Sequence, residues 1–328
     1  MYDVYGLGNA LVDMEFKVED SFLARHGISK GHMTLVDEER IAALVSDLEG
    51  LSPERMSGGS AANSMMAVQG FGGRTYYSCK VSDDETGRYF INDMAGAGIH
   101  TNPNAAAEEG TSGKCLILVS PDAERTMNPF LGISSHLSHH EIDEAALARA
   151  KYFYVEGYLS SSPISLEAAI ACRELAEQNG VETAISLSDP SMLEFFRDNL
   201  TRMLGNGVTH LFCNEEEALA WAKTDRLDIA FKELNDIAHT TNITLGSRGS
   251  VAISPHAHIE VPGYPVKAID TNGAGDMYAG ACLYGWAAGM DEKQAARFGN
   301  FAAAELVQSY GARLQNVEAY QKLLKRFS

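Results

Sequence analysis

Hydrophobic positions follow two alternating patterns along the sequence. Short runs of consecutive or alternating apolar residues are typical of β-strands, whereas apolar residues recurring every three or four positions are typical of amphipathic helices. Strands are predicted at Tyr2–Gly8, Arg74–Val81, Lys114–Val119, Tyr152–Val155, Glu182–Leu187, His210–Cys213 and Asn242–Leu245. Helices are predicted at Ala61–Gln69, Glu85–Ala95, Ser165–Gln178, Ser191–Leu204, Glu215–Ala222, Leu227–His239, Met277–Ala288, Glu292–Ser309 and Val317–Phe327. This alternation predicts parallel strands joined by right-handed crossovers, with helices on both faces of the sheet.

Some extended segments do not fit this alternation. Leu11–Val18 alternates apolar and charged residues, and extended stretches follow at His32–Val36, Ile99–Thr101 and Lys114–Asn128. Strands with one solvated face are typical of a small sheet that lies over a larger one. We therefore predict a β-sheet lid formed by these segments.

The fold class expected from these patterns is α/β, with a doubly wound, mostly parallel sheet in a three-layer α/β/α arrangement. We expect one domain over residues 1–328, with the lid inserted at about 11–36 and 99–128.

Composition narrows the function. The 328 residues include 26 Lys and Arg against 44 Asp and Glu, a net charge of −18. Such a surface repels phosphate backbones, so a nucleic-acid partner is not expected. The cysteines show no metal or disulfide spacing, and no signal peptide or membrane-spanning run is evident. We expect a cytoplasmic protein with no membrane partner.

Gly6-Leu7-Gly8-Asn9-Ala10-Leu11 partly matches the dinucleotide-binding fingerprint. Leu11 stands where that fingerprint needs glycine or alanine, and strand alternation rather than a helix follows. A nicotinamide oxidoreductase is thus a weaker alternative. A sugar or nucleotide sensor that binds without turnover is another.

The strongest chemical signal is Asp270-Thr271-Asn272-Gly273-Ala274-Gly275-Asp276, which precedes an apolar helix. Small residues at a helix N-terminus leave backbone amides free to hold an anion. Asp276 would repel that anion, unless the role of Asp276 is to accept a proton from a nucleophile that attacks the anion. This pairing indicates phosphoryl transfer to a hydroxyl group. The alternative is a glycine turn in which Asp276 is an ordinary carboxylate of the first helical turn.

A second glycine turn, Met56–Ser64, also leads into a predicted helix. Its small residues let a ligand approach the backbone, and Asn63 offers both a donor and an acceptor. Asn9 and Asp13 bracket the junction between the first strand and the predicted lid. We expect these elements to bind the hydroxyl groups of a sugar.

Taken together, these motifs resemble the ribokinase/PfkB family of carbohydrate and nucleoside kinases. Gly58–Asn63 is similar to the family's first signature and Asp270–Asp276 to its second. Asn214–Glu217 resembles its N-x-x-E element, and Thr244–Gly249 matches its T-x-G-x-x-G. The resemblance implies a ribokinase-like fold and transfer of the γ-phosphate of Mg-ATP to a primary hydroxyl of a nucleoside or sugar.

The resemblance also implies roles for single residues. Asp276 would be the catalytic base. The anion hole would be formed by Gly273, Ala274 and Gly275, and the acceptor would be bound by Asn9, Asp13, Gly58, Gly59, Ser60, Asn63 and Arg125. ATP would be bound by Asn214, Thr244, Gly246, Gly249 and Asn300. Mg²⁺ would be held, mostly through water, by Asn214 and Glu217. A monovalent cation such as K⁺ would lie near Asp270 and the Val307–Gly311 segment.

Within the family, Gly8–Asp13, Ser186–Pro190 and Asn214–Ala218 look most like the adenosine kinase branch. That branch carries a mobile arginine where this sequence has Arg125. Apolar residues available to enclose a nucleobase are Met33, Leu35, Phe130, Leu131, Tyr158 and Leu159.

Departures from that branch at Asp189 and at His32-Met33 leave other acceptors open. These are inosine or guanosine and the free sugars ribose, fructose and ketodeoxygluconate. The oligomeric state, monomer or homodimer, is also open.

Overall fold

The computed structural model describes residues 1–51, 53–102, 108–122 and 124–327. Residues 103–107 and 123 of the second predicted lid insertion lie outside the described residues. Within the described part, the large sheet has nine strands, in the order β13 (Ala257–Pro262), β12 (Gly249–Ser254), β11 (Ala238–Thr244), β10 (Val208–Asn214), β9 (Glu182–Ser186), β8 (Ala150–Glu156), β1 (Tyr2–Leu7), β4 (Thr75–Ser78) and β5 (His100–Thr101).

In this order, neighbouring strands from β11 through β10, β9, β8, β1 and β4 to β5 are parallel. β12 and β13 add an antiparallel hairpin at the β11 edge. The predicted mostly parallel sheet is therefore confirmed. The hairpin occupies the region after the last predicted strand, where the chain returns along β11 before entering its C-terminal helices.

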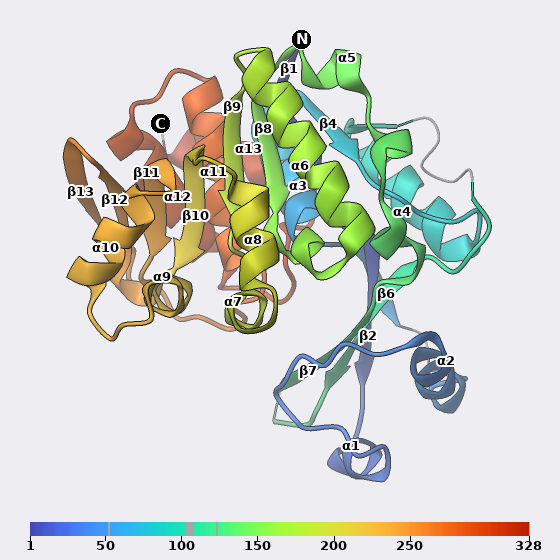
Figure 1. Ribbon diagram of the computed structural model, residues 1–328. Helices are drawn as coiled ribbons and strands as arrows, with labels where there is room; N and C mark the ends of the chain where they lie inside the picture. Colours follow the sequence, from blue (N-terminus) through green and yellow to red (C-terminus); the bar gives the residue numbers. More distant parts are fainter. Residues whose placement is uncertain (52, 103–107, 123, 328) are drawn as a thin grey trace.

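Helices cover both faces of the large sheet (Figure 1). One face carries α3 (Ser60–Phe71), α4 (Glu85–Gly96), α11 (Ala274–Ala287), α12 (Glu292–Leu306) and α13 (Val317–Phe327). The other carries α5 (Glu144–Leu147), α6 (Pro163–Gln178), α7 (Pro190–Phe195), α8 (Arg197–Leu204), α9 (Glu215–Ala222) and α10 (Leu227–Asn235). Successive strand residues point to opposite faces, so Val4 belongs to the first core and Tyr5 to the second. The predicted three layers are confirmed.

A four-stranded second sheet projects below the large one in Figure 1. Within the described residues its order is β3 (Glu54–Gly58), β2 (Leu11–Lys17), β6 (Gly113–Val119) and β7 (Arg125–Phe130). The predicted alternation in β2 is confirmed, because Val12, Met14 and Phe16 are buried. They pack with side chains of α1 (Asp20–Arg25) and α2 (Glu38–Asp47).

The predictions for some individual segments were wrong. Ile99–Thr101 does not join the smaller sheet: β5 pairs with β4 at the edge of the large one. His32–Val36 lies along β7 but is not a strand of the smaller sheet: it makes an isolated bridge at Met33 and Met127, and three backbone hydrogen bonds join it to β7. The predicted helix Ser191–Leu204 breaks at Phe196, where φ −130° is outside the helical region.

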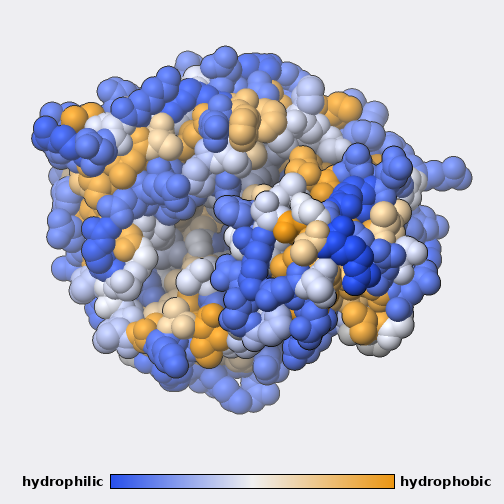
Figure 2. All heavy atoms as spheres, turned by 90° about the horizontal axis from the view of Figure 1, so that it is seen from below, coloured by the Kyte–Doolittle hydropathy of each residue, from blue (hydrophilic) through white to orange (hydrophobic). Residues whose placement is uncertain are grey.

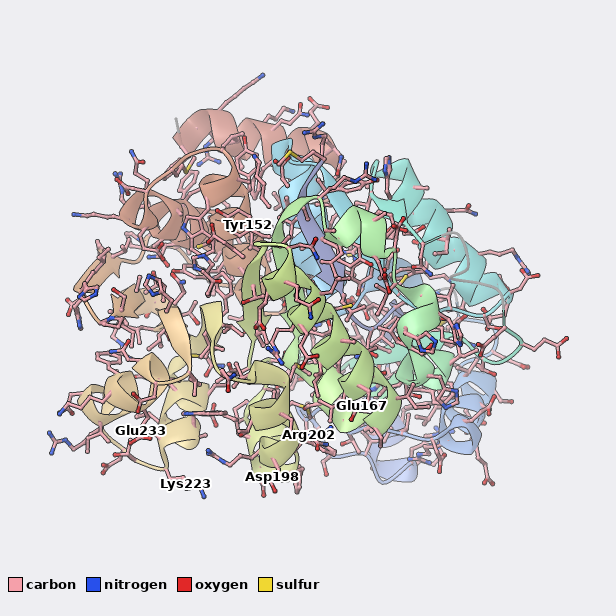
Figure 3. All side chains as sticks on the ribbon, turned by 45° about the horizontal axis from the view of Figure 1, so that its top comes forward. Tyr152, Glu167, Asp198, Arg202, Lys223 and Glu233 are labelled. Carbon is pink, nitrogen blue, oxygen red and sulfur yellow. The ribbon has the colours of Figure 1, made fainter. Side chains whose placement is uncertain are left out.

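The outer helical layer is solvated. Figure 3 labels Glu167 of α6 and Arg202 of α8, which form an ion pair across these helices. Their side chains are 63% and 53% exposed, so the pair contributes at most about 1 kcal/mol to stability. Among the described residues, no helix is both long and apolar enough to cross a membrane.

Candidate active site

A cavity of about 740 Å³ lies where the carboxyl ends of the large sheet's strands face the smaller sheet. Its wall includes Asn9 after β1, Glu156 at the end of β8, Ser186 at the end of β9, Asn214 at the end of β10 and Thr244 at the end of β11. Open α/β sheets bind ligands at this edge. Figure 2, seen from below, shows the surface hollowed beside the smaller sheet, with hydrophobic side chains on the rim.

Most of the predicted site residues line this one cavity, although they come from distant parts of the sequence. Those that do are Asn9, Asp13, Gly59, Ser60, Asn63, Asn214, Glu217, Thr244, Gly273, Ala274, Gly275 and Asp276.

Asp276 lies in the first turn of α11 and is held by two residues of α3. Ser60 Oγ donates to its Oδ1 at 2.6 Å, and Asn63 Nδ2 donates to its Oδ2 at 2.8 Å. Burial raises the pKa of Asp276 to about 6, although these bonds and the charge of Arg313 act to lower it. Ser60 and Asn63, expected to contact a sugar, thus hold this carboxylate.

The turn before α11 has the form expected of an anion-binding helix start. Gly273 is the N-cap, with φ 73° in the left-handed region, and a Cβ there would lie 2.6 Å from the Ala312 backbone. Gly275 has open space where a Cβ would project. The prediction of three free amides needs correction, because the Ala274 N–H donates to the Thr271 carbonyl at 3.2 Å.

The second glycine turn joins β3 to α3. Gly59 has φ 101°, and a Cβ there would lie 2.3 Å from the Asn9 carbonyl oxygen, so this position requires glycine. Gly58 ends β3 and does not line the cavity; a Cβ there would lie 2.5 Å from Asp13 Oδ1.

Glu156 is a wall residue that the sequence analysis missed. It accepts hydrogen bonds from the Asn9 N–H at 2.8 Å, Asn9 Nδ2 at 2.7 Å and the Ala61 N–H at 2.7 Å. Asn9 Oδ1 in turn accepts from Ser134 Oγ at 3.2 Å. Asn9 therefore lies at the cavity, but its side chain is engaged within the protein. The sequence could have pointed to Glu156, because an acidic residue there directly follows the last residue of a predicted buried strand.

Asp13 reaches the cavity from β2. Burial raises its pKa to about 6; Arg313 and Arg125 act to lower it, and Asp276 and Glu15 to raise it. Its side chain belongs to the half-buried face of β2, which is opposite the apolar face packed on α1 and α2.

Asn214 and Glu217 form a capping box at the start of α9. Asn214 Oδ1 accepts from the Glu217 N–H at 2.8 Å, and Asn214 Nδ2 donates to Glu217 Oε1 at 2.7 Å. Burial raises the pKa of Glu217 to about 7, with further raising by Asp189, Glu216 and Asp276. The capping box fixes both side chains at the cavity.

The charge of the wall is uniformly negative. Its carboxyl groups are those of Asp13, Glu156, Asp189, Glu217 and Asp276, and no Lys, Arg or His is among the described residues that line it. A phosphate-bearing ligand would meet this negative charge, which a cation bound beside it would offset. Carboxylate and amide oxygens suit Mg²⁺, which keeps much of its water.

Three predicted ATP-binding residues do not reach the cavity wall. Gly246 lies in the short 3₁₀ turn Gly246–Arg248, and Gly249 begins β12, where a Cβ would lie 2.1 Å from the Val261 carbonyl oxygen. Asn300 is buried, and its Nδ2 donates to that carbonyl at 3.1 Å. These contacts are those of a packing residue.

Arg125 is also outside the large cavity. Its Nη1 contacts Asp270 Oδ2 at 2.6 Å and its Nη2 contacts Glu15 Oε2 at 2.9 Å. It lines a neighbouring pocket of about 120 Å³. Asp270 Oδ2 also accepts from the Gly311 N–H at 2.8 Å. The guanidinium already balances Asp270, so these residues do not fit a monovalent cation in this arrangement.

The expected apolar wall is present in part. Met33, Leu35, Leu131 and Tyr158 line the cavity. Phe130 and Leu159 do not, because both are packed in the hydrophobic cores. Further apolar residues that the sequence analysis missed line it from the other side: Met192, Phe195, Phe196, Phe212 and Tyr278.

Comparison with known proteins identifies the class. The model of the "pfkB family carbohydrate kinase" family matches residues 30–319. Saccharomyces cerevisiae adenosine kinase is 28% identical, covering 93% of this chain and 94% of its own. The crystal structure of Sinorhizobium meliloti adenosine kinase superposes with TM-score 0.90 at 32% identity, covering 100% of this chain and 99% of its own. A probable sugar kinase from Rhizobium etli gives TM-score 0.90 at 30% identity, covering 99% and 98%.

Fold, site and relatives define an ATP-dependent phosphotransferase that acts on a hydroxyl group. The chain belongs to the PfkB family of carbohydrate kinases and has its ribokinase-like fold. The nicotinamide alternative was wrong: β2, not a helix, follows Gly8, and a Cβ at Gly8 would lie 2.8 Å from Glu156 Oε2.

Proposed function

We propose that this enzyme transfers the γ-phosphate of Mg-ATP to a primary hydroxyl of a nucleoside, with adenosine as the preferred acceptor. The observation that carries the proposal is the placement of Asp276. Ser60 and Asn63 hold its carboxylate beside the helix start at Gly273–Gly275, in the cavity shared by both sheets. A base beside an anion-binding helix start is what hydroxyl activation next to a phosphate requires.

In this proposal Asp276 accepts the proton of the attacking hydroxyl. The amides at the start of α11 stabilise the transferred phosphoryl group, and Thr244 lies along the ATP phosphates. Asn214 and Glu217 would hold Mg²⁺ through water, and the bound ion would supply positive charge beside the phosphates in the acidic cavity. We propose no step through a monovalent cation.

A nucleobase explains the apolar rim better than a free sugar does. Leu35 beside β7 is 63% exposed and Phe195 of α7 is 68% exposed, and both line the cavity. Large exposed apolar groups on both sides of a cavity are typical of a surface that a ligand covers. The adenosine kinases among the relatives support the same acceptor.

A panel of acceptors tests the proposal. ADP release is measured with Mg-ATP and adenosine, inosine, ribose or fructose, and adenosine is expected to give the highest kcat/KM. A free sugar that exceeds both nucleosides would reject the nucleoside assignment and leave the phosphotransferase intact. Absence of turnover with every acceptor would instead favour the sensor alternative.

A free sugar is the second candidate because Asp189 brings a carboxylate to the cavity. That carboxylate accepts hydrogen bonds from the Ser191 N–H at 2.8 Å and from Ser191 Oγ, and it caps α7. The cap accounts for Asp189 without a sugar. His32, the other departure, does not line the cavity.

The pH dependence of kcat/KM follows from the raised pKa of Asp276. Only the ionised carboxylate accepts a proton, so activity is expected to rise with pH through about pH 6. Burial also raises the pKa of Asp13 to about 6 and that of Glu217 to about 7, so this rise in activity belongs to the coupled group. A flat profile between about pH 5 and pH 7 would contradict the assignment of the base.

Asp13→Ala is expected to raise KM for the acceptor much more than KM for ATP. We propose that Asp13 accepts hydrogen bonds from the acceptor's hydroxyls, and losing such a bond costs about 1.5–3 kcal/mol, or about 10- to 150-fold in KM. Steady-state kinetics measure both constants. Glu15→Ala, two residues along the same face, is the matched control. An ATP-specific defect would remove Asp13 from the acceptor site.

We propose two further assignments. We infer one kinase domain over residues 1–328, in which the smaller sheet covers the cavity as a lid. Unpaired, buried cysteines support a reducing cytoplasm.

A further inference from the structure

Arg313 lies in the segment between α12 and α13 and is only 4% exposed. Its Nε donates to Asn63 Oδ1 at 2.7 Å, and its Nη1 lies 3.4 Å from Asp93 Oδ2. Asn63 Nδ2 donates to Asp276 Oδ2 at 2.8 Å. A continuous chain of contacts thus connects α4, Arg313, α3 and the proposed base on α11.

The chemistry of these groups fixes the direction of the chain. A guanidinium has donors and no acceptor, so the Asn63 atom that faces Arg313 must be the amide oxygen. The NH₂ group is then left for the carboxylate of Asp276, which has only acceptors when ionised. An amide turned the other way would bring its oxygen against that carboxylate and its NH₂ group against the guanidinium.

We propose that Arg313 is a positioning residue for phosphoryl transfer: it sets the orientation of the Asn63 amide, and this amide holds Asp276 in place. The inference rests on the proposed role of Asp276 as the base. It adds a residue that lines no part of the cavity and belongs to neither family signature. Asp93 anchors the guanidinium on its other side.

The electrostatic surroundings of Asp276 support a role for this cation. Ser60, Asn63 and Arg313 act to lower the pKa of Asp276 against the effect of burial. Asp276 in turn acts to raise the pKa of Asp13, Glu156 and Glu217, and of the Tyr154 and Tyr158 hydroxyls. Arg313 is thus a buried positive charge beside an acidic cluster.

A double-mutant cycle on kcat tests the inference at about pH 8, where the carboxylate is ionised. Arg313→Met is expected to lower kcat about tenfold in the wild-type background, with KM for ATP within about twofold. In the Asn63→Ala background the same substitution is expected to change kcat less than about twofold, because no amide is left to orient. Equal losses in both backgrounds would overturn the proposal.

Conservative and distant substitutions separate positioning from loss of structure. Arg313→Lys keeps a donor toward Asn63 and is expected to recover part of kcat; a lysine variant as slow as Arg313→Met would contradict the inference. Arg173→Met is the matched control, because Arg173 is also buried and ion-paired, with Glu177 on α6. The Arg173→Met variant is expected to leave the pH profile of kcat unchanged, whereas Arg313→Met moves the acidic side of that profile to higher pH.

If Arg313→Met does not fold, Asp93→Asn loosens the other anchor and is expected to lower kcat by a smaller factor.

One readout does not depend on turnover. Carbon-13 NMR of the aspartate carboxyls follows the titration of Asp276 directly, and its pKa is expected to rise in Arg313→Met. An unchanged titration would overturn the inference. If the wild type phosphorylates no acceptor, the proposed function fails separately, and this titration still tests the contact chain.

Discussion

Asp276→Asn is expected to lower kcat by about 10²- to 10⁴-fold, the typical contribution of a positioned general base. The substitution keeps the size of the side chain and the turn at Gly273, so the KM values for ATP and acceptor are expected to change little. What is lost is the group that takes the proton of the attacking hydroxyl. Single-turnover and steady-state measurements of ADP release give both quantities.

Glu167→Gln provides the control for Asp276→Asn. It makes the same change from acid to amide on an exposed helix face, and wild-type kinetics are expected. An Asp276→Asn enzyme that keeps half or more of the wild-type kcat would show that another group activates the acceptor.

Gly275→Val is expected to lower kcat by about 10²- to 10³-fold, as when one anion-hole donor is lost. A Cβ at Gly275 would have no neighbouring atom within 4 Å, and the residue has no positive φ, so valine fits the backbone and projects into the cavity. Its side chain would hold a phosphoryl group away from the amides. The melting temperature is therefore expected to stay close to that of the wild type.

Gly273→Ala is the matched contrast to Gly275→Val. A Cβ at Gly273 would lie 2.6 Å from the Ala312 backbone, and the residue has φ 73°. Alanine there is expected to lower the melting temperature, which thermal unfolding measures. If Gly275→Val folds normally and transfers phosphate at the wild-type rate, the anion is held elsewhere.

The large sheet was predictable because its buried strands carry continuous apolar runs that alternate with capped helices. Strand β3 was missed because Glu54-Arg55-Met56-Ser57-Gly58 has no apolar run; it is held by pairing with β2. Strand β5 has only two residues, so its sequence carries no period. Its place beside β4 depends on tertiary pairing.

The candidate site was predictable where one local turn contains its own chemistry, as at Gly273–Asp276 and Gly59–Asn63. Roles that depend on distant partners were not. Ser60 and Asn63 were assigned to the acceptor because nothing local shows that α3 lies beside α11. Arg313 belongs to no local motif, and its contact with Asn63 spans 250 positions.

Carboxyl groups that line the cavity oppose folding at the pH where the enzyme is proposed to work. Burial raises the pKa of Asp13 and Asp276 to about 6 and of Glu156 and Glu217 to about 7. The unfolded chain binds these protons more weakly, so the stability they contribute is present below about pH 4 and is lost as pH rises through 6 to 7. Asp276→Asn would remove one of these buried charges together with the base, so stability and turnover place opposing demands on this side chain.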